Sequence, residues 1–496
     1  MTYNDATQEE ITRAMETAWS AFQVYRNFSL KQRADFMRAI AEALEALKET
    51  VVPVAMEETS LPRERLAGEL GRTVFQLRSY AAAAEKGEWL EARIDTAVPD
   101  RTPAPKPDLR KMLVPLGPVV VFGASNFPFA YSTAGGDTAC ALAAGCPVIV
   151  KAHPAHAHTS ELVAGAILQA AEATHMPPGI FNHIHGAGFE VGEMLVNHPH
   201  TKAVGFTGSQ AGGKALFDLA AKRKEPIPVF AEMGSINPVF LLPGKLEKDA
   251  ETVAAQYAAS ITQGVGQFCT NPGLLIGIKG ETLNRFTELL GKTIRETTPA
   301  PMLHAGIARA FHNHRSTALA QLDVKMVAVS AHTASEHEGA ATLATAPGDA
   351  FLQNPVLHQE VFGPYSLVIQ CRDAAQMLEV ARRLEGQLTH TLMATEEDLH
   401  THADLLNEVR EHCGRLIING VPTGVEVALA MHHGGPYPAT TDSRFTAVGA
   451  DGIKRFARPL CLQNFPDGAL PDELKNGNPL GIWRTVNNEL TREAIA

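Results

Sequence analysis

The hydrophobic positions in the first 80 residues recur at helical spacing. Four apolar residues follow one another at intervals of three or four and therefore share one helix face: Phe36, Ile40, Leu44 and Leu47. A Leu-Pro pair at 61–62 interrupts this pattern, and a second helical stretch follows, because proline is tolerated at the start of a helix but not inside it. The pattern predicts helices over residues 9–77.

Short apolar runs alternate with helical stretches from residue 116 onward. The predicted strands are 119–122, 148–150, 180–184, 203–207 and 227–231. The helical stretches between them are 138–144, 161–173, 191–196 and 214–221. This alternation predicts a parallel sheet covered by helices on both faces. Ligands of such sheets bind at the carboxyl ends of the strands.

A second alternating region begins near residue 235. Its predicted strands are 274–278, 366–369 and 416–418, and its predicted helices are 253–261, 283–290, 377–384 and 404–409. Residues 420–440 are punctuated by glycine and proline and predict a loop-rich segment. The fold class that follows is α/β, with two doubly wound domains.

The composition and net charge argue against nucleic-acid-binding and membrane proteins. Hydrophobic residues make up 45% and charged residues 20% of the 496 residues, and the net charge is −11, which is typical of a soluble protein. A mildly acidic chain without a Lys/Arg stripe is a poor match for nucleic acid or an anionic membrane. The apolar runs are shorter than the roughly 20 residues of a membrane-spanning helix. The N-terminus is polar and the six cysteines are irregularly spaced, so we expect a cytoplasmic protein. We also expect no nucleic-acid or membrane partner.

One of the cysteines is a candidate nucleophile. Cys269 lies in GQFCTNPG, where Gly266 and Pro272 indicate a turn between a helix and a strand. A thiol on such a turn is a candidate nucleophile if a positive charge or a helix N-terminus lowers its pKa; the alternative is a thiol buried in a loop. Cys140 and Cys146 lie in apolar sequence, and we expect them to be inert packing residues.

Two polar residues follow predicted strands. Glu232 comes directly after the strand in PIPVFAE, where partial desolvation would raise its pKa and make it a base near neutral pH. The alternative is a glutamate in a salt bridge. Asn126, in FGASNFPFA, is either an amide donor to an oxyanion or an ordinary turn residue.

A glycine-rich segment is a candidate anion-binding site. Gly208, Gly212 and Gly213 lie between a strand and a helix in FTGSQAGGKAL, and Ser209 is a candidate helix cap or phosphate donor. The spacing is not GxGxxG, so the usual dinucleotide fingerprint is absent.

Lys151 ends a predicted strand, and three histidines follow it. His153, His156 and His158 suggest a metal site, but no acidic or cysteine ligand lies among them. Metal ligands are usually fixed on rigid elements with supporting hydrogen bonds. We therefore expect no metal here, and instead a solvated loop near a nucleotide ribose.

Several motifs together resemble the aldehyde dehydrogenase superfamily. They occur in the family's order: PLGPVVVFGASNFP, GCPVIVKAHPA, AVGFTGSQAGGKAL, FAEMGSINP, GQFCTNPG and EVFGPYSLVI. The resemblance runs from about Thr7 to Asn464, and the 37-residue separation of Glu232 and Cys269 is close to the family's usual one. The segments GGDTA, EPIPVFAE and NGVPTGVEV are most similar to a bacterial branch that oxidises 2,5-dioxopentanoate (α-ketoglutaric semialdehyde). A related branch oxidises fatty aldehydes.

The resemblance implies a catalytic role for three residues. Cys269 would attack the aldehyde carbon, and the Asn126 side chain and the Cys269 amide would hold the oxyanion. Glu232 would activate the water that hydrolyses the thioester. The expected reaction is the NAD(P)-dependent oxidation of 2,5-dioxopentanoate to 2-oxoglutarate.

The resemblance also implies a cofactor site. Lys151 would contact the adenosine ribose, and Ser209 the pyrophosphate. Glu360, in EVFGP, would bind the nicotinamide ribose with Phe362 beside the ring, and the glycines expected at the site are Gly208, Gly212 and Gly234. NAD-preferring members usually carry a glutamate three residues after the lysine, where this chain has Pro154. NADP is therefore favoured over NAD.

The resemblance further implies the domain plan and the partners. Residues 1–93 and 114–233 would form the dinucleotide-binding domain, 234–457 the catalytic domain, and 94–113 and 458–496 the segments that join subunits in a homodimer or homotetramer. For a substrate carboxylate, the candidate cations are Arg78, Arg444 and Arg455, without grounds to choose among them.

Three alternative activities remain at this point, together with a noncatalytic scaffold protein that has kept the fold. The scaffold is the least favoured, because Asn126, Glu232 and Cys269 are all present. A fatty aldehyde dehydrogenase is the first. An enzyme that transfers the acyl group to coenzyme A is the second, although such relatives generally lack the base at the Glu232 position. A cysteine hydrolase is the third; it needs a histidine partner for Cys269, and GQFCTNPG provides none locally.

Overall fold

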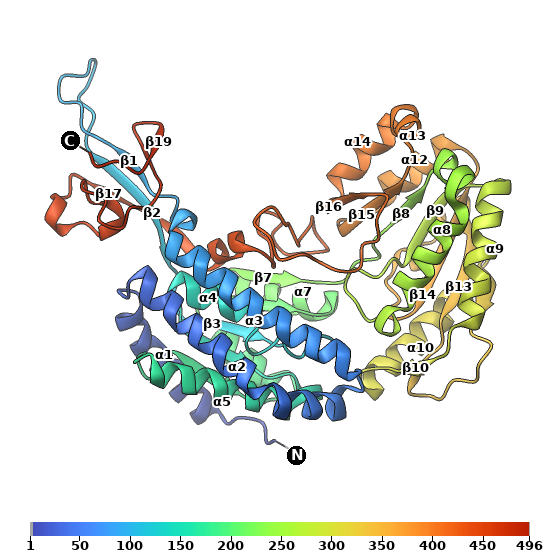
Figure 1. Ribbon diagram of the computed structural model, residues 1–496, viewed down its shortest axis with the longest axis horizontal. Coiled ribbons are helices and arrows are strands. Elements are labelled where there is room, and N and C mark those ends of the chain that lie inside the picture. The colour runs from blue at the N-terminus through green and yellow to red at the C-terminus, as the bar shows by residue number, and fades with distance from the viewer. Residues whose placement is uncertain (1–2, 496) are drawn as a thin grey trace.

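The computed structural model describes residues 3–495 and contains two large helix-covered sheets and a smaller projecting sheet (Figure 1). The outermost residues of the first and last predicted segments, 1–2 and 496, lie outside the described residues. A two-stranded ribbon, β10 (Ala300–Pro301) with β12 (Glu338–Gly339), completes the sheets. The two large sheets form the two lobes of the body.

The first lobe is a five-stranded parallel sheet in the order β5-β4-β3-β6-β7. Its strands are β3 (Val119–Phe122), β4 (Val148–Lys151), β5 (Phe181–Ile184), β6 (Ala203–Thr207) and β7 (Val229–Glu232). Its helices are α1 (Gln8–Tyr25), α2 (Leu30–Thr59), α3 (Arg63–Lys86), α4 (Gly136–Ala144), α5 (Ala157–Ala173), α6 (Glu190–Asn197) and α7 (Gln210–Ala221). The predicted helical N-terminus and all five predicted strands are present.

Alternation along β3 explains the two helical layers. Val119 and Val121 pack in the cluster formed with α2, α3, α4 and α5, whereas Val120 points the other way and packs with α1 and α6. Successive strand residues face opposite sides of a sheet, so a continuous valine run requires cover on both faces. The doubly wound prediction is confirmed.

The second lobe is a seven-stranded sheet in the order β11-β13-β14-β9-β8-β15-β16, parallel except for β11. Its strands are β8 (Val239–Leu241), β9 (Leu274–Ile278), β11 (Lys325–Val329), β13 (Thr342–Pro347), β14 (Tyr365–Cys371), β15 (Gln387–Met393) and β16 (Cys413–Ile418). Its helices are α8 (Pro243–Thr262), α9 (Glu281–Glu296), α10 (Ala305–Leu319), α11 (Gly348–Gln353), α12 (Ala374–Arg383), α13 (Glu396–Thr401) and α14 (Ala403–Glu411). Helices α8 and α9 cover one face, and α10, α11, α12 and α14 cover the other.

A five-stranded arm projects from the first lobe and carries the C-terminal segment (Figure 1). Its order is β17-β2-β1-β18-β19, with bounds β1 (Arg93–Asp95), β2 (Leu109–Pro115), β17 (Ala457–Gln463), β18 (Arg484–Val486) and β19 (Glu489–Thr491). Strands β2 and β17 pair along seven residues, and β1 pairs in parallel with β18. The arm therefore joins residues 93–115 to the C-terminal segment.

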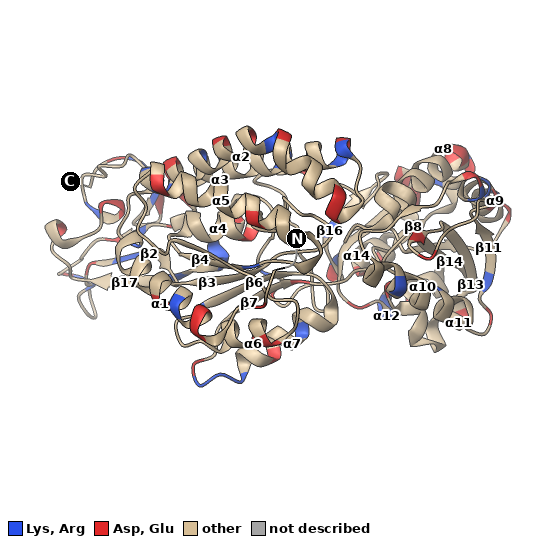
Figure 2. Ribbon diagram, turned by 90° about the horizontal axis from the view of Figure 1, so that it is seen from below, with Lys and Arg blue, Asp and Glu red and all other residues tan. Residues whose placement is uncertain are grey.

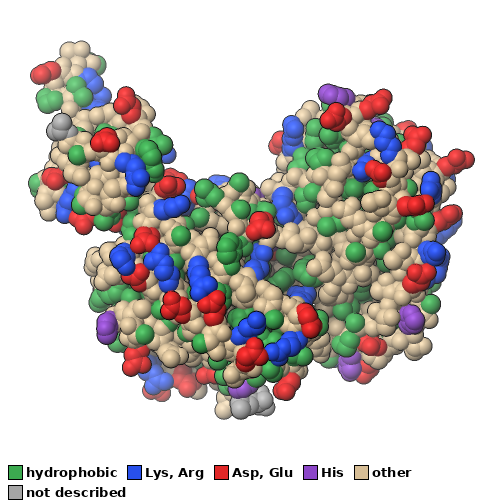
Figure 3. Space-filling view, in the orientation of Figure 1, with side chains coloured by type: hydrophobic (Ala, Val, Ile, Leu, Met, Phe, Trp, Pro, Cys, Tyr) green, Lys and Arg blue, Asp and Glu red, His purple; other side chains and the backbone are tan. Residues whose placement is uncertain are grey.

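Charged residues lie mainly on helices and loops, and the strands of the first sheet carry few of them (Figure 2). On the face shown in Figure 3, acidic and basic side chains are interspersed, and the molecule is hollowed between the arm and the second lobe. Among the described residues, no helix has both the length and the apolar composition that crossing a membrane requires.

Candidate active site

Glu232 lies at the carboxyl end of β7. The strand begins at Val229 and not at residue 227 as predicted, because the prolines at 226 and 228 lack the N–H that a ladder needs. Its end is fixed by a distant segment: the Met233 N–H donates to the Ala439 carbonyl at 2.8 Å, and Glu232 forms an isolated β-bridge with Thr440. The C-terminal half of the chain thus closes over the end of the first sheet.

Cys269 lies in a tight loop between α8 and β9. The turn before it contains three consecutive left-handed residues, with φ values of 54°, 58° and 63° at positions 264–266. A Cβ at Gly266 would overlap the Gly363 carbonyl, so glycine is required there. The side chain of Asn237 then holds the loop by donating to the carbonyls of Cys269 and Asn271, each at 2.9 Å. Sequence reasoning missed Asn237, whose partners lie more than 30 residues away.

One cavity of about 270 Å³ brings the predicted site residues together. All three predicted catalytic residues line it: Asn126, Glu232 and Cys269. Five residues predicted for the cofactor also line it: Gly208, Ser209, Gly234, Glu360 and Phe362. Of the predicted site residues, Lys151 and Gly212 do not line this cavity. The convergence joins segments from β3, β6, β7, the Cys269 loop and the EVFGP loop.

The Asn126 amide is oriented toward the loop that carries Cys269. Its Nδ2 donates to the Gln267 carbonyl at 3.2 Å, and the side chain is buried. Arg65 fixes the backbone beside it by donating to the Asn126 carbonyl at 2.9 Å. That bond to Gln267 uses one N–H of the amide, so the geometry leaves the second for an oxygen formed beside the sulfur.

Carboxylates, and not a positive charge, dominate the surroundings of the thiol. Burial raises the pKa of Cys269 well above its usual value, and Glu232 and Glu360 raise it further. The thiol is therefore protonated at neutral pH and must lose its proton during the reaction. Burial also raises the pKa of Glu360, to about 8.

A histidine contacts both Glu232 and Cys269. His433 Nε2 lies 3.0 Å from Glu232 Oε1 and 3.7 Å from Cys269 Sγ. Burial favours a raised pKa for Glu232, but the charge and hydrogen bond of His433, with the Cys269 thiol, hold it below the usual value. The expectation of a raised Glu232 pKa is therefore wrong. His433 lies in the predicted loop-rich segment, 164 residues from Cys269, and no local signal points to it.

The β6–α7 turn fits the pyrophosphate of a dinucleotide. Ser209 caps α7, its Oγ accepting the Gly212 N–H at 3.2 Å, and both Gly208 and Ser209 are exposed. The N-terminus of this 12-residue helix presents backbone N–H groups and a positive dipole end to an anion. A Cβ at Gly234 would overlap the Glu360 carboxylate, so glycine also lets these two segments approach.

Lys151 lies at the end of β4, outside the cavity around Cys269. Burial lowers its pKa, and the Asp5 carboxylate opposes this effect. Asp5 is held beside the sheet by the Ala187 N–H, at 2.7 Å. Pro154 begins a short 3₁₀ turn three residues after Lys151.

The three histidines that follow Lys151 point to different partners. His156 is buried and bonds the Ala124 carbonyl at 2.8 Å, His158 bonds the Tyr3 hydroxyl at 2.9 Å, and His153 Nδ1 accepts the Ala155 N–H. The expected solvated loop is wrong, because His156 anchors the segment inside the fold.

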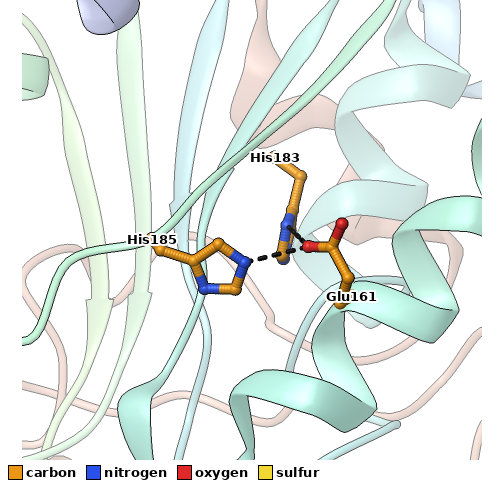
Figure 4. Close-up of side chains that lie close together, drawn as sticks. All are labelled: Glu161, His183 and His185. Carbon is orange, nitrogen blue, oxygen red and sulfur yellow. Dashed lines mark hydrogen bonds and ion pairs between the residues drawn. The ribbon is translucent and has the colours of Figure 1, made fainter. Parts of the chain in front are cut away.

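A separate cluster joins α5 to the end of β5. Glu161 Oε2 lies 3.0 Å from His183 Nδ1 and 2.9 Å from His185 Nε2, with both rings turned toward the carboxylate (Figure 4). Burial, with the charge of His185, lowers the pKa of His183 to about 4. Ser160 lies 2.7 Å from the other ring nitrogen of His183, so the cluster ties the helix to the edge strand.

The arginines considered from the sequence are each paired with a carboxylate: Arg78 with Glu45, Arg444 with Asp442 and Arg455 with Asp137. Two other arginines act on the cavity. Burial raises the pKa of the Tyr131 hydroxyl, whereas the charge of Arg72 lowers it, and Arg415 interacts electrostatically with Cys269 and Tyr131. Both also donate to backbone carbonyls of residues 422–425. Tyr131 lines the cavity beside Cys269.

Comparison with known proteins assigns the family. The aldehyde dehydrogenase family model matches residues 1–456. The chain belongs to the aldehyde dehydrogenase family. It is 48% identical over 479 residues to alpha-ketoglutaric semialdehyde dehydrogenase 2 of Azospirillum brasilense, covering 97% of this chain and 91% of that protein. It is 47% identical to the alpha-ketoglutaric semialdehyde dehydrogenase of Acinetobacter baylyi, covering 99% and 93%.

Solved aldehyde dehydrogenases share the fold. A 1-pyrroline-5-carboxylate dehydrogenase from Thermus with bound NAD matches with a TM-score of 0.78 at 23% identity, covering 92% of this chain and 86% of that one. Betaine aldehyde dehydrogenase from Staphylococcus aureus in complex with NAD+ matches with a TM-score of 0.79 at 18% identity, covering 94% and 90%. The protein is thus an NAD(P)-dependent aldehyde dehydrogenase, an oxidoreductase with a small-molecule substrate.

Proposed function

We propose that this aldehyde dehydrogenase oxidises 2,5-dioxopentanoate to 2-oxoglutarate. The observation that carries the reaction is the convergence of Cys269, Glu232 and Asn126 on one cavity. The substrate is supported by the two relatives at 47–48% identity over nearly the whole chain, both named as alpha-ketoglutaric semialdehyde dehydrogenases.

The proposed roles follow from the contacts. The Cys269 thiol loses its proton to the Glu232 carboxylate, and the sulfur attacks the aldehyde carbon while the carbonyl electron pair moves to oxygen. The Asn126 Nδ2 and the Cys269 backbone N–H hold that oxyanion. Glu360 and Phe362 would hold the nicotinamide end of NAD(P)+, which would supply the hydride acceptor when bound. Glu232 releases the thiol proton to solvent and then removes a proton from water. The hydroxide attacks the thioester, the C–S bond breaks, and the Cys269 thiolate takes the proton back from Glu232.

Glu232 supports hydrolysis over transfer to coenzyme A. Its carboxylate is buried, ionised and adjacent to the sulfur, which is what a base for an attacking water requires. His433 supplies the histidine that a cysteine hydrolase would use, but family membership and the glycine-lined turn support the dehydrogenase.

Arg72 and Arg415 are proposed to receive the carboxylate of the substrate. Both arginines interact electrostatically with Tyr131, which lies beside Cys269, and Arg415 also interacts electrostatically with the Cys269 thiol. Their bonds to the 422–425 carbonyls fix the guanidinium groups without cancelling their charge. An aldehyde with an anionic end is therefore favoured over a neutral one.

An aldehyde panel with Arg415→Gln tests this proposal. We expect the natural protein to turn over 2,5-dioxopentanoate with a higher kcat/KM than succinic semialdehyde or a long-chain aldehyde. Losing one charged hydrogen bond should raise KM for 2,5-dioxopentanoate about 10- to 100-fold, with little change for a neutral aldehyde. Arg444→Gln, at an exposed arginine, is the control. Preference for the long-chain aldehyde contradicts the proposed substrate, whereas an equal loss on both aldehydes contradicts only the role of Arg415.

We also propose that NADP is preferred over NAD. Lys151 offers a positive charge near the expected ribose, and position 154 lacks a carboxylate to repel a 2′-phosphate. Pro154→Glu should lower kcat/KM for NADP about tenfold or more through like-charge repulsion, with NAD unaffected, whereas Pro154→Gln should change neither. Steady-state kinetics with both cofactors measure this; strong NAD preference in the natural protein contradicts it.

The arm is proposed to join subunits in a homodimer or homotetramer. Its large apolar side chains are partly exposed in the single chain: Leu460, Leu480, Trp483 and Leu490. We propose a cytoplasmic location, which the six free cysteines of the described residues support.

A further inference from the structure

One side chain contacts both the proposed nucleophile and the proposed base. A carboxylate oxygen of Glu232, Cys269 Sγ and a ring nitrogen of His433 all lie within 4.8 Å of one another. The side chains of His433 and Glu232 are each only 2% exposed. The three come from β7, the Cys269 loop and the segment after β16, so the fold assembles them from separate regions.

We infer that His433 is a catalytic residue, whose Nε2–H orients Glu232 and stabilises the Cys269 thiolate. The inference rests on the roles proposed above for Cys269 and Glu232. It adds a third member to the site, which neither the sequence motifs nor the relatives' names assign.

The first part of the role follows from the hydrogen bonds of Glu232. An ionised carboxylate can only accept, so at 3.0 Å the Nε2 atom of His433 must carry the proton and donate to Oε1. The other oxygen, Oε2, is buried and has no hydrogen-bond partner among the described residues. An unpartnered buried acceptor is costly, and here it is the atom that remains available to take a proton from the thiol or from water.

The second part follows from the position of the sulfur. At 3.7 Å, Nε2 is within hydrogen-bonding distance of Sγ, and the same N–H can turn toward the thiolate once Glu232 has taken the thiol proton. In the first half of the cycle the proton moves from Sγ to Oε2 as the C–S bond forms, and Glu232 releases it to solvent before water attacks. In the second half a proton moves from water to Glu232, and it returns to the sulfur after the C–S bond breaks. His433 keeps its own proton throughout and stabilises whichever neighbour is negative.

The backbone fixes the ring in this position. The His433 N–H donates to Thr446 Oγ1 at 2.9 Å, and the Ala447 N–H donates to the His433 carbonyl at 2.8 Å. The other titratable groups that act on this trio are Tyr131, His432, Glu360, Arg415 and Arg455. Arg455 is paired with Asp137, which leaves His433 as the donor in direct contact with Glu232.

The test compares His433→Phe, which keeps a ring but removes the donor, with His433→Gln, whose amide can still donate. Without the donor, the pKa of Glu232 rises, so the acidic limb of the kcat/KM profile moves to higher pH. The thiolate also loses stabilisation, so alkylation of Cys269 by iodoacetamide, measured without cofactor or substrate, moves to higher pH as well. We expect kcat to fall about 100-fold or more in His433→Phe, with KM changed little and most of the loss recovered in His433→Gln.

Controls separate this role from a structural one. His432→Gln makes the same chemical change one residue away and should leave both pH profiles in place. In a Glu232→Gln background, adding His433→Phe should cost much less than it does alone, because the two act together. Unchanged kcat/KM and alkylation profiles in His433→Phe, or a loss in His433→Gln as large as in His433→Phe, with Cys269→Ala inactive, overturn the inference alone. An active Cys269→Ala overturns the proposed function instead.

Discussion

Replacing Cys269 with alanine will lower kcat/KM for aldehyde oxidation by at least about 10⁴-fold, because no other group can form the covalent bond to the aldehyde carbon. The thiol lines the cavity with Glu232 and Asn126, and its loop is held by the Asn237 amide. The fold should survive the change, since the backbone bonds of the loop do not involve the sulfur. Formation of reduced nucleotide, followed by absorbance, measures the loss.

Cys461→Ala is the matched control for that experiment. Cys461 is an exposed thiol on β17 of the arm, and its removal should leave the rate unchanged. Labelling with iodoacetamide should lose the slow, substrate-protected site only in Cys269→Ala. If that variant keeps more than a small fraction of the activity, Cys269 is not the nucleophile.

Replacing Glu232 with glutamine will make release of the acid the slow step. Glutamine keeps the size and the contact with His433 but cannot accept a proton. Loss of the Glu232 charge removes one of the groups that raise the pKa of the Cys269 thiol. Solvent can therefore deprotonate the thiol more easily than water, whose pKa is about 15.7, so hydrolysis suffers more than attack. We expect kcat to fall about 10²- to 10⁴-fold and one equivalent of reduced nucleotide to form rapidly per active site.

Rapid mixing and mass spectrometry measure that second result. The burst should coincide with an acyl group on Cys269, seen as a mass increase on the peptide that contains it. Gln263→Glu, on the short turn before the loop, leaves Glu232 intact and should show no burst. Loss of turnover without burst or acyl-enzyme would mean that Glu232 limits the attack step, and a normal rate would remove it from the mechanism.

The first sheet was predictable because its strands are apolar runs between clear helical stretches. Parts of the second sheet were not. Strand β15 reads QLTHTLM, and every residue in it is buried, yet its centre is polar. Thr389 is tolerated there because its hydroxyl donates to Asn237 Oδ1 at 3.0 Å, a partner that lies on a different segment. Three-residue β8 is too short for any periodicity.

Some residues of the candidate site were also predictable from the sequence, and others were not. Cys269, Glu232 and Asn126 were found because each lies in a contiguous motif with its own turn or strand end. His433, Asn237 and Arg415 were not, because each matters through a contact with a residue far away in the chain. Only the three-dimensional structure shows that the histidine between two glycine-rich turns reaches the sulfur.

The bridge between Glu232 and Thr440 has a consequence for biosynthesis. The first sheet is complete once residue 232 has left the ribosome, and its contacts are largely sequential, which favours rapid folding. The end of β7 nevertheless remains uncovered until about 210 further residues have been made, since Thr441 pairs with Ala231. A nascent chain released before that point would carry a folded nucleotide lobe with an open strand edge and no working chemistry. Translation of the segment around residue 440 therefore decides whether the polypeptide becomes an enzyme.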